Sequence, residues 1–318
     1  MQAAELIALK EAYEPNNYIP PQDPVPPRTP REKFAANITA IRTLKSIEKR
    51  MADGGPHANG EEQEILAQYS GWGGLSDAFE PNKDSWHSEY TELKSLLTEE
   101  EYAAARSSTL TAFYTPPAVI DAMYTALRKM GVGAGTILEP SMGVGAFFGQ
   151  SHSYLYEPTT RLFGVELDSL TGRIARQLYQ KANIQITGFE KADLPDSFFD
   201  VVIGNVPFGD YSVVDPQYNR LHFKIHDYFF AKSIDKLRTG GIIAFITTSG
   251  TLDKKSEEVR RYINARCDFI GAVRLPDSTF KSAGTKAMAD IIFLQKRDRI
   301  LEQDAGCCTP PRRRTGLP

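Results

Sequence analysis

The strongest constraint on the fold of this chain is the alternation of short apolar runs with helical patterns in its second half. The runs are bounded by Gly, Pro or Asp and indicate strands, at residues 136–140, 162–167, 183–187, 199–203 and 241–247. Helical spacing marks the segments 117–130, 169–181 and 226–238. Two further strands, at 269–273 and 290–295, follow a helical stretch at 255–266 with no clear helix between them. We therefore expect an α/β fold with a mostly parallel sheet, closed by an antiparallel C-terminal hairpin.

The first third of the chain shows helical patterns without strands between them. Apolar side chains recur at helical spacing in three stretches: Arg31 to about Met51, 61–69 and 91–106. In the third stretch, Thr98 is followed three residues later by Glu101, the pattern of a capping box. The turn Gly71–Gly74 carries Trp72, which we expect to anchor the core between subdomains.

These patterns divide the chain into four predicted regions. A short helix over 1–13 and a proline-rich linker or strap over 14–30 come first. A helical subdomain is expected over 31–110, the domain that contains the sheet over 111–298, and a disordered tail over 299–318.

Composition restricts the surroundings in which the chain works. The net charge is −3, so any surface that binds nucleic acid must be locally positive. The three cysteines have neither zinc spacing nor a disulfide pattern, which favours a reducing cytosol. No apolar run approaches the roughly 20 residues that span a bilayer, and no secretion signal is recognisable. We expect a cytoplasmic protein that does not bind a membrane.

A glycine-rich turn follows the first strand. It consists of Glu139, Pro140, Ser141, Met142, Gly143, Val144 and Gly145. Glycines at a strand-to-helix turn let the backbone approach a ligand beyond the carboxyl end of the strand. An ordinary tight turn would show the same glycines. The lysine of a phosphate-binding loop is absent, and Glu139 suits a positively charged ligand better than a phosphate.

An acidic residue, Glu166, ends the next strand about 20 residues after the glycines, where a carboxylate can accept both hydroxyl protons of a ribose. A solvated carboxylate at a strand end is the alternative interpretation. Asp168, two residues later, is expected to cap the following helix.

The most specific pattern is Asn205, Val206, Pro207 and Phe208, after the strand at 199–203. The amide oxygen of Asn205 and the carbonyl of Val206 can each accept one hydrogen of an aromatic amine, which localises the nitrogen lone pair. Pro207 stiffens the loop, and Phe208 offers a face for stacking. Alone, these four residues would indicate only a turn with a buried Phe; their order after the glycine turn and Glu166 favours a site.

Together these residues resemble the gamma class of amino-methyltransferases, which carry a cofactor loop followed by an Asn-Pro-Pro-Phe/Tyr tetrapeptide. The resemblance implies a Rossmann-like methyltransferase sheet, S-adenosylmethionine as cofactor and adenine in DNA as substrate. It further implies that Tyr114 and Thr115, within Phe113–Pro117, contact the methionine part of the cofactor. Asp193, with Phe189 or Glu190 nearby, would contact its adenine. From Tyr69 to about Arg297 the chain is similar to the methylase module of methylase–helicase fusion proteins of conjugative elements and phages.

The chain also departs from the family pattern. Val206 replaces the usual first proline, but the carbonyl thought to act at this position is retained. Neither a helicase motif nor a sizeable recognition domain follows the sheet. Recognition of the DNA target sequence is therefore expected to come from the helical subdomain or from a partner, such as a helicase. Otherwise it is expected to have low specificity.

The expected mechanism is direct methyl transfer to a flipped adenine, which Asn205 and Val206 hold and on which Phe208 stacks. The segment 209–223 either closes over the base or is a surface loop. His222 and His226 are expected to be structural. A basic cluster, Lys254, Lys255, Arg260 and Arg261, either meets phosphates or forms a solvated helix face.

Two other functions remain open. Methylation of a protein glutamine amide uses the same kind of tetrapeptide, although the Trp72 segment argues against it. A degenerate module that binds cofactor or DNA without turnover is supported by Val206 and by the missing recognition domain.

Overall fold

The computed structural model describes residues 13–21, 28–109, 114–155, 159–280 and 288–301. Almost all of the predicted N-terminal helix, six residues of the proline-rich linker, Phe113 and most of the predicted disordered tail lie outside these ranges. Among the described residues, no helix is both long enough and apolar enough to cross a bilayer.

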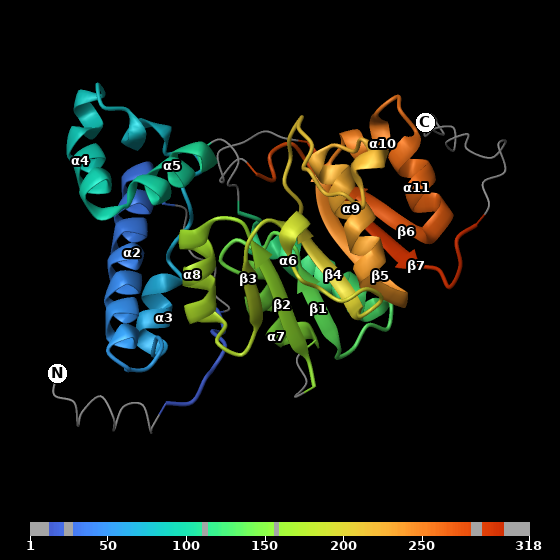
Figure 1. Ribbon diagram of the computed structural model, residues 1–318, viewed down its shortest axis with the longest axis horizontal. Coiled ribbons are helices and arrows are strands. Elements are labelled where there is room, and N and C mark those ends of the chain that lie inside the picture. The colour runs from blue at the N-terminus through green and yellow to red at the C-terminus, as the bar shows by residue number, and fades with distance from the viewer. Residues whose placement is uncertain (1–12, 22–27, 110–113, 156–158, 281–287, 302–318) are drawn as a thin grey trace, which may run out of the picture.

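The described residues form one seven-stranded sheet with the order β3-β2-β1-β4-β5-β7-β6 (Figure 1). Its strands are β1 (Thr136–Glu139), β2 (Arg161–Glu166), β3 (Asn183–Ile186), β4 (Phe199–Asn205), β5 (Leu237–Thr248), β6 (Cys267–Arg274) and β7 (Ala289–Lys296). β1 to β5 pair in parallel, whereas β7 pairs antiparallel with both β5 and β6. This confirms the predicted mostly parallel sheet and its antiparallel C-terminal hairpin.

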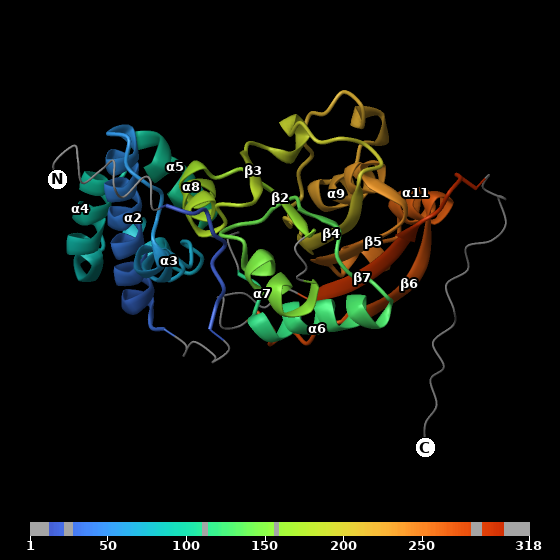
Figure 2. The same cartoon turned by 90° about the horizontal axis from the view of Figure 1, so that it is seen from below.

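Helices cover both faces of the sheet. α6 (Pro117–Lys129) and α7 (Ala146–Leu155) lie on one side, and α9 (Ile225–Lys236) and α11 (Glu258–Arg266) lie on the other (Figure 2). Successive strand residues point to opposite faces, so Ile137 belongs to one core and Leu138 to the other. Burial on both faces explains why these strands are continuous apolar runs in the sequence.

A helical module, defined here as residues 30–108, packs against the β3 edge of the sheet through α8 (Ser169–Leu178) (Figure 1). It contains α2 (Pro30–Ala52), α3 (Gly60–Leu66), α4 (His87–Leu96) and α5 (Glu99–Ser108), with short 3₁₀ turns at Ser76–Phe79 and Asp84–Trp86. The buried amide of Gln63 joins the module to α8 by donating to the carbonyl of Gln177 at 2.9 Å. The core of the module is continuous with the core under one face of the sheet.

Trp72 is buried, as predicted for a core residue, but the rings on which it packs edge-to-face, Phe79 and Phe34, belong to the helical module and not to a neighbouring subdomain. Other predictions need correction. The helical pattern over 91–106 is two helices, α4 and α5, because the chain is extended at Leu97 and Thr98 caps α5. The stretch 255–266 is helical only from Glu258, after the short α10 (Gly250–Asp253), and α7 was not predicted. Two further 3₁₀ turns lie at Phe189–Lys191 and Asn219–Leu221.

The Thr98 cap gives a test of how the module is held together. The Thr98 hydroxyl accepts from the Glu101 N–H at 3.2 Å, and Glu101 also bonds Lys45 of α2 at 3.1 Å. We expect Thr98→Ala to lower the free energy of unfolding by about 1 kcal/mol, the usual value of a lost N-cap, as measured by urea denaturation. Thr39→Ala, inside α2, is the control and should be neutral or stabilising; equal losses in both variants would contradict the role of the cap.

Candidate active site

The three predicted segments meet at the carboxyl edge of the sheet. The Ser141 hydroxyl, in the turn after β1, donates to the Asn205 carbonyl at the end of β4 at 2.9 Å. The Gly143 N–H donates to Glu166 Oε2, at the end of β2, at 2.8 Å. The glycine turn is therefore joined directly both to the acidic strand end and to the tetrapeptide.

The glycine turn has a backbone that other residues rarely adopt. Gly143 and Gly145 have φ angles of 55° and 85°, in the left-handed region. A Cβ at Gly145 would lie 2.5 Å from the ring of Tyr179, so this position also requires the space that glycine leaves. The Met142 N–H donates to the Val165 carbonyl at 3.0 Å and ties the turn to β2.

Glu166 is held by backbone donors on both carboxylate oxygens, because its Oε1 accepts from the Asp168 N–H at 2.8 Å. Burial raises the pKa of Glu166 to about 7, against the lowering effect of these N–H groups. Asp168 caps α8, as predicted, by accepting from the Thr171 N–H at 2.8 Å.

Glu139 is an acidic side chain that is buried without a full set of partners. It is 2% exposed, and its Oε2 has no hydrogen-bond partner. Burial, and then the charge of Glu166, raises its pKa well above the usual range for a carboxyl. A ligand with a cationic or hydrogen-bond-donating group would satisfy this oxygen.

The tetrapeptide presents a second buried oxygen without a partner, the Oδ1 of Asn205. Val206 is buried, and its N–H donates to the Ile246 carbonyl of β5 at 3.0 Å. A proline could not make this bond. Phe208 is half-buried between the two cores of the sheet.

The other residues that were predicted to contact the cofactor differ in how deeply they are buried. Tyr114 packs against the glycine turn, and Thr115 is buried just before α6. Asp193 is exposed, and its backbone is clamped by Gln185 of β3 at 2.9 and 2.7 Å. Phe189 is buried, with its ring 4.9 Å from that of Phe229.

The sequence did not single out one buried group behind the tetrapeptide, Asp227. It pairs with Lys254, which removes that lysine from the predicted basic cluster, and one of its oxygens lies 3.6 Å from His226 Nε2. The pKa of His226 is lowered overall, because burial outweighs the raising effects of Asp227 and of the Gly209 backbone. His222 precedes α9, so it shares no helix face with His226, and the described residues contain no group of three metal ligands.

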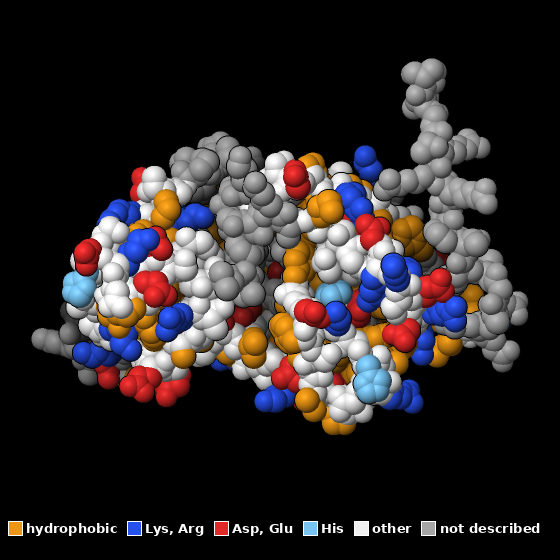
Figure 3. Space-filling view, turned by 90° about the horizontal axis from the view of Figure 1, so that it is seen from above, with side chains coloured by type: hydrophobic (Ala, Val, Ile, Leu, Met, Phe, Trp, Pro, Cys, Tyr) orange, Lys and Arg blue, Asp and Glu red, His pale blue; other side chains and the backbone are white. Residues whose placement is uncertain are grey.

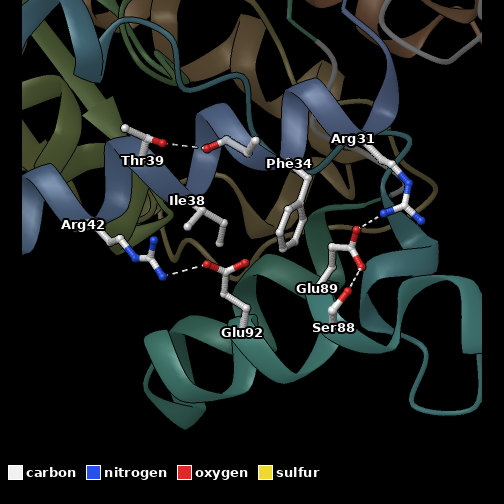
Figure 4. A pocket seen from close by; sticks show the side chains of 9 residues that line it. Arg31, Phe34, Ile38, Thr39, Arg42, Ser88, Glu89 and Glu92 are labelled. Carbon is white, nitrogen blue, oxygen red and sulfur yellow. Dashed lines mark hydrogen bonds and ion pairs between the residues drawn. The ribbon is translucent and has the colours of Figure 1, made fainter.

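The molecular surface is hollowed between the helical module and the sheet at this edge, with acidic side chains in the depth of the hollow (Figure 3). A separate groove of about 330 Å³ lies within the module, between α2 and α4 (Figure 4). Its charged side chains are already paired, Arg31 with Glu89 and Arg42 with Glu92, so it offers little free polar chemistry.

Comparison with known proteins identifies relatives. Residues 96–306 match the family model described as N-6 DNA Methylase. The Defense against restriction protein B of Escherichia phage P1 is 27% identical over 272 residues, which cover 84% of this chain and 10% of that protein. The uncharacterized protein YtxK of Bacillus subtilis is 26% identical over 156 residues, 45% of this chain and 46% of that protein. The chain therefore spans less than half the length of each of these relatives.

Two solved structures share the fold. A putative class I S-adenosylmethionine-dependent methyltransferase from Listeria monocytogenes has a TM-score of 0.51 at 17% identity, covering 89% of this chain and 90% of that chain. A modification subunit of a putative type I restriction enzyme from Vibrio vulnificus has a TM-score of 0.50 at 15% identity, covering 84% and 76%. The sheet is thus of the kind found in such methyltransferases.

The raised pKa of Glu166 predicts a pH dependence of stability. Between the pKa of an unfolded glutamate, about 4.3, and about 7, the folded chain binds more protons than the unfolded chain. The free energy of unfolding should therefore fall as pH rises through this window, by about 4 kcal/mol at most. Urea denaturation from pH 5 to 8 should show a smaller decline for Glu166→Gln than for the wild type.

Glu64→Gln, at an exposed position of α3, is the matched control and should keep the wild-type decline. Parallel declines for the wild type and Glu166→Gln would show that Glu166 titrates normally.

Proposed function

This chain belongs to the N-6 DNA methylase family, and from this we propose that it transfers a methyl group from S-adenosylmethionine to the exocyclic amine of adenine in DNA. The best support is the unpaired Oδ1 of Asn205, on a residue whose carbonyl is bonded to the glycine turn through Ser141. This contact brings an acceptor for the amine next to the loop proposed to hold the cofactor.

The tetrapeptide would act on the amine and on the ring. Asn205 Oδ1 and the Val206 carbonyl each accept one amine hydrogen, so that the nitrogen lone pair is localised for attack. Phe208, half-buried beside them, stacks on the flipped base. No strong general base is needed, because the nitrogen loses its proton readily once it carries the methyl group.

The described residues fit the cofactor. S-adenosylmethionine supplies an electrophilic methyl group. The residues that would hold it include the two before α6 and those of the glycine turn: Tyr114, Thr115, Pro140, Ser141, Gly143 and Gly145. Three acidic side chains would also contact it. The unpaired Oε2 of buried Glu139 suits its cationic part. Glu166 would exchange its bonds to backbone N–H groups for ribose hydroxyls, and the exposed Asp193 would receive the adenine amine.

The remaining proposals concern the setting of the reaction. We propose a helical subdomain over 31–110 and a methyltransferase domain over 111–298, with target choice made by the former or by a partner such as a helicase. Of the described residues, Cys267 is a free, buried cysteine, which agrees with a reducing cytosol. The segment 209–223 carries the exposed Tyr211 and is proposed to close over the base.

Removal of the amide at position 205 tests the activity. We expect Asn205→Ala to lower kcat by about 100-fold or more, as for the loss of one group that stabilises a transition state, while cofactor affinity stays within about twofold. The assay is transfer of tritiated methyl to unmethylated DNA, followed by nucleoside digestion and mass analysis. Asn264→Ala, at an exposed position of α11, is the matched control.

Methyladenosine that depends on Asn205 supports the proposed activity. Label found in protein glutamine would replace it with amide methylation, and cofactor binding without turnover would replace it with a binding module.

Val206→Pro restores the usual family residue. It tests whether position 206 acts through its backbone carbonyl, which the variant keeps, or through its side chain, which the variant changes. The variant loses the bond to Ile246, so the free energy of unfolding should fall by about 1 kcal/mol or more, while kcat stays within about tenfold of wild type because the carbonyl remains. Urea denaturation and the same methyl-transfer assay measure the two effects. A loss of kcat as large as that of Asn205→Ala would contradict the role of the carbonyl.

A further inference from the structure

The turn 69–74 of the helical module lies outside the matched family region, and α2 holds it firmly. Asn37, fully buried on α2, donates to the Gly71 carbonyl at 2.7 Å and accepts from the Ser70 N–H at 2.9 Å. At the other end of the turn, the Gly74 N–H donates to the Thr109 carbonyl at 3.2 Å. A buried amide that satisfies two backbone groups fixes the turn as part of the module.

This turn is in close contact with the ring of Tyr114. A Cβ added to Gly71 would lie 2.8 Å from Cε2 of the Tyr114 ring, so only a glycine permits this approach. At the opposite ring edge, a Cβ added to Gly143 would lie 3.4 Å from Cε1. The ring therefore lies between a glycine of the helical module and a glycine of the turn after β1.

A second contact joins the same turn to the acidic strand end. Tyr69 is 2% exposed and lies beside Asp168 and Thr171, at the start of α8. Burial, and then the nearby charge of Asp168, raises the pKa of Tyr69. The Ser70 hydroxyl between these contacts is buried without a partner, as are the oxygens of Glu139 and Asn205 described above.

We propose that residues 69–71, the first part of this turn, form one wall of the cofactor pocket by fixing Tyr114 against Gly143, and that Gly74 lies outside this wall. Gly71 and Asn37 are then positioning residues for cofactor binding, and the helical module is an integral part of the site. This inference rests on the proposed function, because the ligand of the pocket is taken to be S-adenosylmethionine.

Two glycines of the same turn provide the test. Gly71 and Gly74 both have positive φ angles, 66° and 76°, so Gly71→Ala and Gly74→Ala introduce a similar backbone strain. Only the methyl group added at position 71 meets Tyr114; at position 74 there is nothing within 4 Å. Calorimetry should show that Gly71→Ala weakens binding of S-adenosylmethionine and S-adenosylhomocysteine at least tenfold, while Gly74→Ala stays within about threefold of wild type.

A second pair of variants covers the case in which Gly71→Ala does not fold. Asn37→Ala releases the turn, whereas Gln63→Ala removes another buried amide, which joins the module to the C-terminal end of α8. We expect cofactor affinity to fall at least tenfold in the first variant and to be nearly unchanged in the second, with melting temperatures recorded for both.

The outcomes distinguish the two levels. If the wild type binds cofactor but Gly71→Ala binds it as well as Gly74→Ala, and Asn37→Ala as well as Gln63→Ala, the proposed wall is refuted and the proposed function stands. If the wild type binds neither S-adenosylmethionine nor S-adenosylhomocysteine, the proposed wall and the proposed function are both refuted.

Discussion

The parallel pairing of β1, β2 and β4 is the constraint on which the site depends. Parallel strands end at the same edge, so residues that are 27 positions apart, Glu139 and Glu166, and others 64 apart, Ser141 and Asn205, become neighbours. The bond from the Ser141 hydroxyl to the Asn205 carbonyl is the most direct result of that geometry. Any change that shifted β4 against β1 would separate the turn from the tetrapeptide before it altered either segment.

Two of the buried polar atoms without a hydrogen-bond partner lie where these strands end, and the others in the described residues lie in the helical module and on α9. Glu139 Oε2 and Asn205 Oδ1 are both buried without a hydrogen-bond partner, and such an atom costs about 1–3 kcal/mol. By contrast, both carboxylate oxygens of Glu62 in α3 accept hydrogen bonds, from Arg50 and from the Asn59 N–H. The fold thus gives up stability at this edge, as expected where a ligand completes the hydrogen bonding.

The sequence predicted features that depend on local pattern. The strands, the Thr98 and Asp168 caps and the glycine turn all follow from neighbouring residues. It failed where tertiary packing decides. α7 has no clear apolar face because it is buried on more than one side, and a Cβ on its Gly149 would meet both Tyr179 and Pro20. The Gly71–Tyr114 contact likewise joins segments 43 positions apart that no periodicity relates.

The two halves of the chain therefore have different relations to the family. The family model begins at residue 96, so it contains the sheet but not Asn37 or Gly71. The likeness to the phage P1 protein covers 84% of this chain, more than lies between residue 96 and the end, so it extends into the helical module. The segment that packs on Tyr114 therefore lies outside the region that the family model matches. On the inference drawn above, the helical module contributes a wall of the cofactor pocket in addition to the role in target choice that is proposed for it.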